Sequence, residues 1–179
     1  MFHRKPNLFS RIFSILGFTT GDLWRWSKDN GLRILPGTNA TEPNGIEIST
    51  DEKYVYANMY FESEVWKIDT EKGGVAAKVK IASPDNSAWI EENRLWVASH
   101  TGSILQQAIC LGNQSKPCGT PFEIIELNTE TMETSVVFSQ EGPPMGAATV
   151  AVPQGKRVYM GSFVGDRLIS APLSEFVKK

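Results

Sequence analysis

The sequence is short of four features that would each have pointed to a different class of protein. It contains 179 residues with only two cysteines, and no apolar run is long enough to span a bilayer. No block of lysine or arginine stands out, and a formal net charge of −2 gives no electrostatic reason to expect nucleic acid as a partner. Sustained helical periodicity is also missing between residues 20 and 173. What remains is the composition of one globular domain with a substantial core.

The two cysteines and two short motifs bear on location. Cys110 and Cys118 both lie in CLGNQSKPC, where glycine, asparagine and proline would let the chain turn back and form a disulfide. Acceptor sequons for glycosylation occur at 39–41 and 113–115. Short sequons also arise by chance, and two cysteines this close in sequence are often both reduced. Together they slightly favour a secreted or periplasmic location over the cytoplasm.

A pattern of paired strands repeats along the chain. In PNGIEISTDEKYVY, Ile46 and Ile48 alternate with polar residues, which predicts a half-buried strand, and YVY follows a polar turn as a second strand. Asp85-Asn86 precedes a second pair, at 87–98, and Met145-Gly146 precedes a third. Asn44 and Asp85 are 41 residues apart (85 − 44), a spacing typical of propeller blades.

Further strands complete a repeat of four-stranded units. They are expected at 22–26, 32–35, 64–68, 75–81, 122–127, 134–138 and 167–171. This repeat predicts an all-β fold, a partial β-propeller of about three blades over residues 20–175, with residues 1–19 as a lead-in segment of unclear structure.

About three blades are fewer than the roughly four to eight that close a ring. We therefore expect either a fragment of a longer protein or a chain that self-associates to complete the ring. The two open flanks should expose apolar side chains, such as those of Trp26, Ile34, Val158 and Leu168.

Polar residues stand at equivalent entrances to the inner strands. The innermost strands of a propeller begin at one end of the central channel, so the side chains of Asn44 and Asp85-Asn86 should converge there. A carboxylate with amide oxygens suits Ca²⁺ or another oxygen-preferring divalent cation, and does not suit zinc or copper. The alternative is that these residues only cap the incoming loops.

Three stretches of the sequence resemble a known superfamily. PNGIEISTDEKYVYANMYFESEVWKID and SPDNSAWIEENRLWVASHTGS look like consecutive blades of the senescence-marker-protein, gluconolactonase and paraoxonase superfamily, and the resemblance continues from PFEIIELN to LISAPL. It covers most of residues 21–173 and is greatest to the arylesterase branch, given the Asp-Asn pair followed by LWVASH. The resemblance implies a six-bladed propeller with a catalytic Ca²⁺ in its channel, of which this chain would be the C-terminal half.

The resemblance also implies roles for single residues. Asn44, Asp85 and Asn86 would be calcium ligands, and Asp85 would in addition act as a general base. His100 follows the LWVAS strand and is a second candidate catalytic residue, with an ordinary surface loop as the alternative. The acidic ligand that the family draws from its first blade has no counterpart in this sequence.

The expected function is that of a calcium-dependent hydrolase acting on a small-molecule ester or lactone, present as a truncated or inactive half. Two alternatives stay open: a non-catalytic propeller that serves as a binding or scaffold module, and a strictosidine-synthase-like protein, which would not need the metal.

Overall fold

The computed structural model describes residues 17–112 and 119–176. Most of the expected lead-in segment, together with Cys118 and the second sequon, lies outside these residues. No helix within the described part of the chain is long and apolar enough to cross a membrane.

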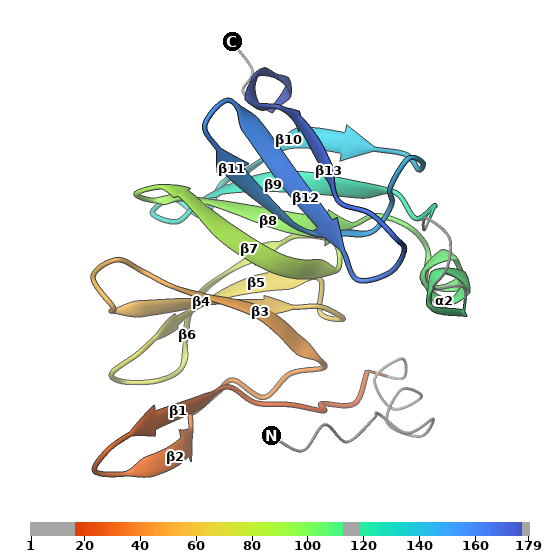
Figure 1. Cartoon of the computed structure of the whole chain (residues 1–179). Helices are drawn as coiled ribbons and strands as arrows, with labels where there is room; N and C mark the ends of the chain where they lie inside the picture. The colour runs from red at the N-terminus through yellow and green to blue at the C-terminus, as the bar shows by residue number, and fades with distance from the viewer. Residues whose placement is uncertain (1–16, 113–118, 177–179) are drawn as a thin grey trace.

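In these residues, thirteen strands form four antiparallel sheets, which stack one above another in Figure 1. A hairpin comes first, and two sheets of four strands follow, which we call the first and second blades. A three-stranded sheet, called here the third sheet, completes the stack. The hairpin consists of β1 (Trp24–Ser27) and β2 (Gly31–Ile34), and the first blade of β3 (Pro43–Ile48), β4 (Tyr54–Met59), β5 (Glu64–Asp69) and β6 (Val75–Lys80). The second blade consists of β7 (Pro84–Glu91), β8 (Arg94–His100), β9 (Phe122–Asn128) and β10 (Thr134–Gln140), and the third sheet of β11 (Ala148–Gln154), β12 (Arg157–Ser162) and β13 (Ile169–Pro172).

Each sheet is a meander in which strands consecutive in sequence are neighbours in space. The inner strands β3, β7 and β11 lie next to one another, so that the start of each sheet meets the start of the next. The all-β fold class and the partial propeller of about three blades are therefore confirmed, and the predicted strands match the observed ones within a few residues.

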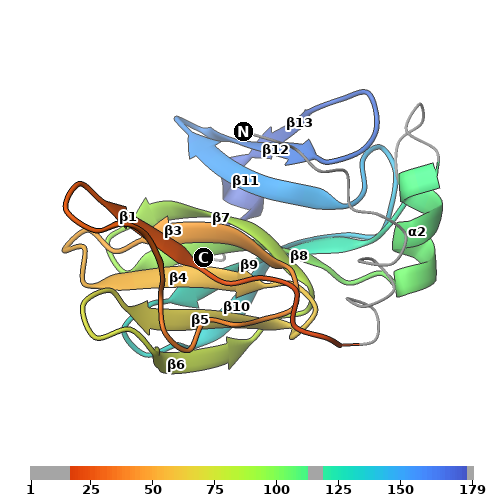
Figure 2. The same ribbon diagram turned by 90° about the horizontal axis from the view of Figure 1, so that it is seen from below.

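One helical segment was not predicted. α2 (Ile104–Gly112) follows β8, and a short 3-10 turn, η1 (Leu173–Glu175), follows β13. The expectation of no helix between residues 20 and 173 is wrong at α2, because a helix this short repeats its apolar positions too few times to show a period. In Figure 1 and Figure 2, α2 stands beside the sheets and not between them.

A capping box marks the start of α2. The backbone N–H of Ser103 donates to Gln106 Oε1 (2.8 Å), and the backbone N–H of Gln106 donates to Ser103 Oγ (3.3 Å). Cys110, near the end of the helix, is buried and disulfide-bonded. Its predicted partner, Cys118, lies outside the described residues.

The core lies between consecutive sheets. β4 is buried on both faces: Val55, Ala57 and Met59 pack towards the hairpin, whereas Tyr56 packs towards the second blade. The next layer, between the second blade and the third sheet, holds Trp96, Phe122, Phe176 and further apolar side chains. A strand sandwiched in this way must place its few polar side chains at its ends or pair them internally.

The outer flanks are apolar and exposed. Trp24 pairs with Ile34 and Trp26 with Leu32 across the hairpin, and all four side chains are between 47% and 68% exposed. Exposure was predicted for Trp26, Ile34 and Leu168 and is confirmed. For Val158 the prediction is wrong, because this side chain is fully buried between the second blade and the third sheet.

The alternation in β3 was predicted correctly, but the prediction that Ile46 and Ile48 lie on its buried face is wrong. Ile46 and Ile48 are 58% and 50% exposed, whereas Gly45 between Asn44 and Ile46 is buried. Leu23, Leu35 and Ala40, from the segments on either side of the hairpin, cover β4 and β5 but leave the apolar face of β3 open.

Candidate functional site

Matching irregularities occur at the start of β3 and of β7. The register of β3 against β4 shifts between Pro43 and Ile46, and that of β7 against β8 shifts between Pro84 and Ser87. A β-bulge redirects side chains and often lies beside a functional site. Asn44 lies in the first bulge, and Asp85 and Asn86 lie in the second, so the offset of 41 residues seen in the sequence is an equivalence in the structure.

Gly45 lets the two bulges approach each other. A Cβ atom at this position would lie 2.5 Å from the carbonyl oxygen of Asp85 and 2.6 Å from the Cα atom of Asn86. No side chain fits there, so the contact requires glycine. The Asn-Gly pair is thus not a hairpin turn: the glycine brings β3 against β7, and the asparagine before it lies at the pocket.

Asn58 holds the bulge of β7 from the adjacent strand. Its fully buried side chain donates from Nδ2 to the carbonyl oxygen of Asp85 (2.7 Å) and to Ser87 Oγ (2.9 Å). The hydroxyl of Ser87 lies 3.2 Å from Asn58 Oδ1 and donates to it in an alternative arrangement. The sequence analysis missed Asn58, although a lone asparagine within the apolar strand YVYANM was a usable signal.

Asp85 is a buried carboxyl group that pairs with no lysine or arginine among the described residues. Only 7% of the residue is exposed, and this burial raises the pKa of Asp85 to about 6, although a hydrogen bond from Asn44 acts in the opposite direction. Asn86 Nδ2 also donates to Asp85 Oδ1 (2.7 Å). Within the described residues its one ion-pair contact is with His100, whose Nε2 lies 3.8 Å from Asp85 Oδ2.

His100 ends β8 and is 2% exposed, so the alternative of a surface loop is wrong. Its Nε2 lies 3.0 Å from the carbonyl oxygen of Ala148, and its Nδ1 lies 2.9 Å from the hydroxyl of Tyr60. Because a carbonyl oxygen only accepts, Nε2 carries a proton. Burial lowers the pKa of His100, and the Ala148 carbonyl offsets part of this effect.

The four residues proposed from the sequence line one pocket of about 430 Å³. The remaining lining residues come from both blades, from α2 and from the third sheet, and are Glu42, Tyr60, Phe61, Gln107, Thr149 and Phe163. Tyr60 and Gln107 were not singled out from the sequence. Burial raises the pKa of Tyr60, so its hydroxyl stays protonated.

The donor set of this pocket is rich in oxygen. Among the residues that the structure describes, no three His, Cys, Asp or Glu side chains gather in the manner of a metal site. The candidate ligands are one carboxylate, Asp85, and two amides, Asn44 and Asn86, with Glu42 on the same pocket wall. Ca²⁺ accepts such ligands and completes its shell with water, so these residues fit that ion.

The sequence model of the arylesterase family matches residues 5–170 of this chain. A comparison with curated proteins found no match. Among solved structures, the chain is similar to a luciferin-regenerating enzyme, with 20% identity and a TM-score of 0.53 over 80% of this chain and 44% of that one. It is also similar to a chain of a nidogen/laminin complex, with 12% identity and a TM-score of 0.57 over 90% and 58% of the two chains. A functionally unknown protein from Desulfotomaculum acetoxidans matches with 11% identity and a TM-score of 0.50, over 86% and 47%. These structures share the fold, and this chain spans about half of their length.

Proposed function

This chain belongs to the arylesterase family, and we propose that the pocket at the start of β3 and β7 binds Ca²⁺ and hydrolyses a small-molecule ester or lactone. The observation that carries the proposal is the state of Asp85. Its carboxyl group is buried beside two amide side chains, and this burial raises its pKa. No lysine or arginine of the described residues compensates its negative charge. A bound cation would supply that compensation.

Each pocket residue has a role in this proposal. Side-chain oxygens of Asn44, Asp85 and Asn86 would hold the ion, which, when bound, polarises the ester carbonyl and stabilises the negative charge that develops on its oxygen. Asp85 is also the candidate base for the attacking water.

His100 was the second candidate catalytic residue, but both of its ring nitrogens contact protein atoms. The proposal therefore gives His100 a positioning role. The rings of Tyr60, His100 and Phe163 form an aromatic wall, with His100 lying 5.7 Å from each of the other two ring centroids. This wall would orient the substrate and exclude water.

The proposal also covers assembly and location. The exposed apolar side chains on the hairpin and on β3 at one flank, and around Leu168 at the other, would be covered if two copies of the chain joined their open flanks. The disulfide at Cys110 supports a location outside the reducing cytoplasm.

Calcium titration and ester hydrolysis, measured on the full chain, test the proposal. Calorimetry with CaCl₂ and assays with phenyl acetate and a simple lactone should show binding and turnover, and both should be lost in Asp85→Asn. Asp166→Asn is the matched control, because Asp166 is an exposed aspartate whose partner is its neighbour Arg167. Equal calcium binding by Asp85→Asn would refute the site. Calcium binding without turnover would favour the alternative of a non-catalytic propeller module.

A further inference from the structure

A continuous series of close polar contacts crosses the wall of the pocket. Gln107 Nε2 donates to the carbonyl oxygen of Gly102 (3.0 Å), and the hydroxyl of Tyr60 donates to Gln107 Oε1 (2.6 Å). The same hydroxyl oxygen lies 2.9 Å from His100 Nδ1, and His100 Nε2 donates to the carbonyl oxygen of Ala148 (3.0 Å). Every contact is within hydrogen-bonding distance, and the side chains of Tyr60, His100 and Gln107 all line the pocket.

The donor and the acceptor are fixed at both ends of this series of contacts. A backbone carbonyl only accepts, so Gln107 must turn its NH₂ group to Gly102 and therefore its oxygen to Tyr60. For the same reason His100 must turn a protonated Nε2 to Ala148. The hydroxyl of Tyr60 lies between these two oriented halves. Gln107 Oε1 and Nδ1 of the neutral His100 ring are both acceptors, so the single hydroxyl hydrogen is donated to one of them at a time while the other stays in contact with the hydroxyl oxygen.

Tyr60 connects four different elements of the structure. It follows β4 of the first blade, whereas Gln107 belongs to α2, His100 ends β8 of the second blade, and Ala148 starts β11 of the third sheet. The ring of Tyr60 also packs edge-on against His100, at 74°, and against Phe61, with centroids 5.3 Å apart. The ring contacts fix where Tyr60 lies, and the hydroxyl fixes how His100 and α2 are oriented towards it.

We propose that Tyr60 is a positioning residue, whose hydroxyl holds the His100 ring beside Asp85 and docks α2 against the pocket. With its hydroxyl in place, His100 keeps Nε2 on Ala148, 3.8 Å from Asp85 Oδ2. Its effect on turnover rests on the proposed hydrolysis, but its effect on the histidine ring does not.

Histidine NMR on the full chain tests this role directly. The chain has two histidines, so a His3→Gln background leaves His100 as the sole source of ring signals. Tyr60→Phe removes the hydroxyl and keeps the ring, and Tyr159→Phe, at a half-exposed position on β12, is the matched control. We expect the ¹⁵N resonance of Nδ1 to shift in Tyr60→Phe and to stay in place in Tyr159→Phe, while Nε2 remains protonated in both. An unchanged Nδ1 resonance in folded Tyr60→Phe would overturn the proposal.

Variants at Gln107 keep the test decisive if Tyr60→Phe does not fold, because Gln107 lies on a helix beside the sheets. Gln107→Leu removes the acceptor of Tyr60 and should shift the His100 signals. Gln107→Glu keeps an oxygen acceptor for Tyr60 and should restore the wild-type spectrum only in part, because its second carboxylate oxygen cannot donate to the carbonyl of Gly102. Identical spectra for all three proteins would contradict the role of Tyr60 as the link.

Turnover separates this proposal from the proposed function. In Tyr60→Phe we expect kcat for phenyl acetate to fall about tenfold with little change in KM, the size of one well-placed hydrogen bond. A wild-type chain without esterase activity whose His100 signal still shifts in Tyr60→Phe would refute the hydrolase and support the positioning role. Active wild-type protein with neither shift nor loss in the variant would do the reverse.

Discussion

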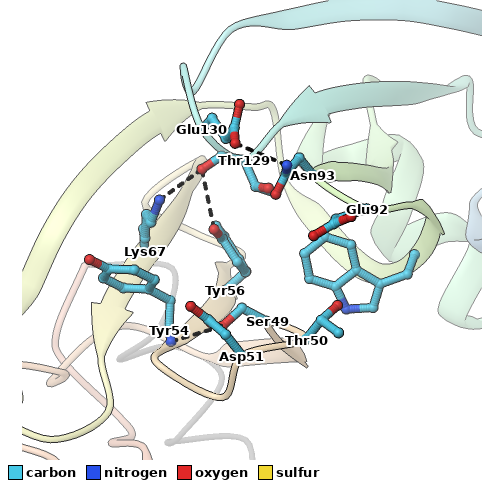
Figure 3. Close-up of a pocket in the computed structure, with 11 residues that line it drawn as sticks. Ser49, Thr50, Asp51, Tyr54, Tyr56, Lys67, Glu92, Asn93, Thr129 and Glu130 are labelled. Carbon is cyan, nitrogen blue, oxygen red and sulfur yellow. Dashed lines mark hydrogen bonds between the residues drawn. The ribbon is translucent and has the colours of Figure 1, made fainter.

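The first and second blades meet along a seam, and the same strands contribute to both of its ends. The two ends differ in whether their buried polar side chains are paired within the fold. At the pocket end lie Asn44 of β3, Asn58 of β4 and Asp85 of β7. At the far end lie Tyr56 of β4, Lys67 of β5, Trp89 of β7 and the carbonyl of Thr129, which surround a depression of about 310 Å³ (Figure 3). The comparison is close, because β4 and β7 contribute a residue to each end.

At the far end Lys67, Tyr56 and Trp89 each donate to a backbone carbonyl within the fold. Lys67 Nζ and the hydroxyl of Tyr56 both donate to the carbonyl oxygen of Thr129, at 2.8 Å and 3.2 Å, as Figure 3 shows. Lys67 also lies 4.4 Å from the centre of the Tyr54 ring, and Trp89 Nε1 donates to the carbonyl of Ile48 (3.0 Å). The positive charge is therefore satisfied by a carbonyl and an aromatic face, and this end ties the blades together.

At the pocket end, Asn58 satisfies the backbone of the bulge, but no lysine or arginine of the described residues pairs with the buried carboxyl group of Asp85. Burying a carboxylate in this way is costly unless something else binds there. The far end therefore stabilises the seam, whereas burial of Asp85 at the pocket end costs folding free energy that a bound ligand would offset. Strongly perturbed groups of this kind gather at functional sites.

Gly45→Ala should have the largest effect on this comparison, because it forces apart the backbones of β3 and β7 at the pocket end. We expect the free energy of unfolding in urea to fall by about 3 kcal/mol, the cost of overpacking against backbone that cannot move. Gly119→Ala is the control, since a Cβ atom there meets nothing within 4 Å and its backbone is not in the left-handed region. Equal stability of the two variants would mean that the blades do not need this close approach.

The second-largest effect expected is that of calcium on the thermal stability of variants at the two ends. An ion that binds only the folded chain stabilises it by about 2.7 kcal/mol at a hundredfold excess over Kd. We expect this gain in thermal unfolding of the wild type and of Lys67→Met, and no gain in Asp85→Asn. Stabilisation of Asp85→Asn by the same concentration of calcium would show that the ion acts elsewhere on the chain.

The sequence revealed those parts of the site that repeat locally. Asn44 and Asp85 were found as equivalent positions because 41 residues separate two copies of one local pattern, whereas the bulges in which they lie were not predicted. The interactions of Asn58 and Tyr60 were not found, because their partners Asp85 and His100 are 27 and 40 residues away and only the stacking of sheets brings them together.

Burial was the least predictable property, because it depends on the neighbouring sheet. Alternation in β3 shows that Ile46 and Ile48 share a face, but not whether another element covers it. Val158 shows the reverse, since a position expected on an open flank is covered by the second blade. The helix α2 was predictable in principle, from the pair Ser103 and Gln106 of its capping box.

Asn58→Ala should destabilise the chain by about 2 kcal/mol, because it leaves the buried carbonyl of Asp85 without its donor. It should also weaken calcium binding, since the bulge that directs Asp85 into the pocket loses its support. Ser87→Ala removes only one of the contacts of Asn58 and should cost less. Urea unfolding and calorimetry of the two variants measure both effects, and a larger loss in Ser87→Ala would contradict the role given to Asn58.

Lys67→Met should have the smallest effect and the most selective one. The methionine side chain keeps most of the length and apolar contacts of lysine but loses the hydrogen bond to Thr129 and the attraction to Tyr54. The carbonyl of Thr129 retains the hydroxyl of Tyr56 as a donor, so no buried acceptor is orphaned, and the loss should be about 1 kcal/mol in urea unfolding. Calcium affinity and hydrolysis of phenyl acetate should equal those of the wild type, because the two ends of the seam share strands but no polar contact. A variant that unfolds at the wild-type urea concentration but binds calcium more weakly would reverse the assignment, placing function at the far end and stability at the pocket.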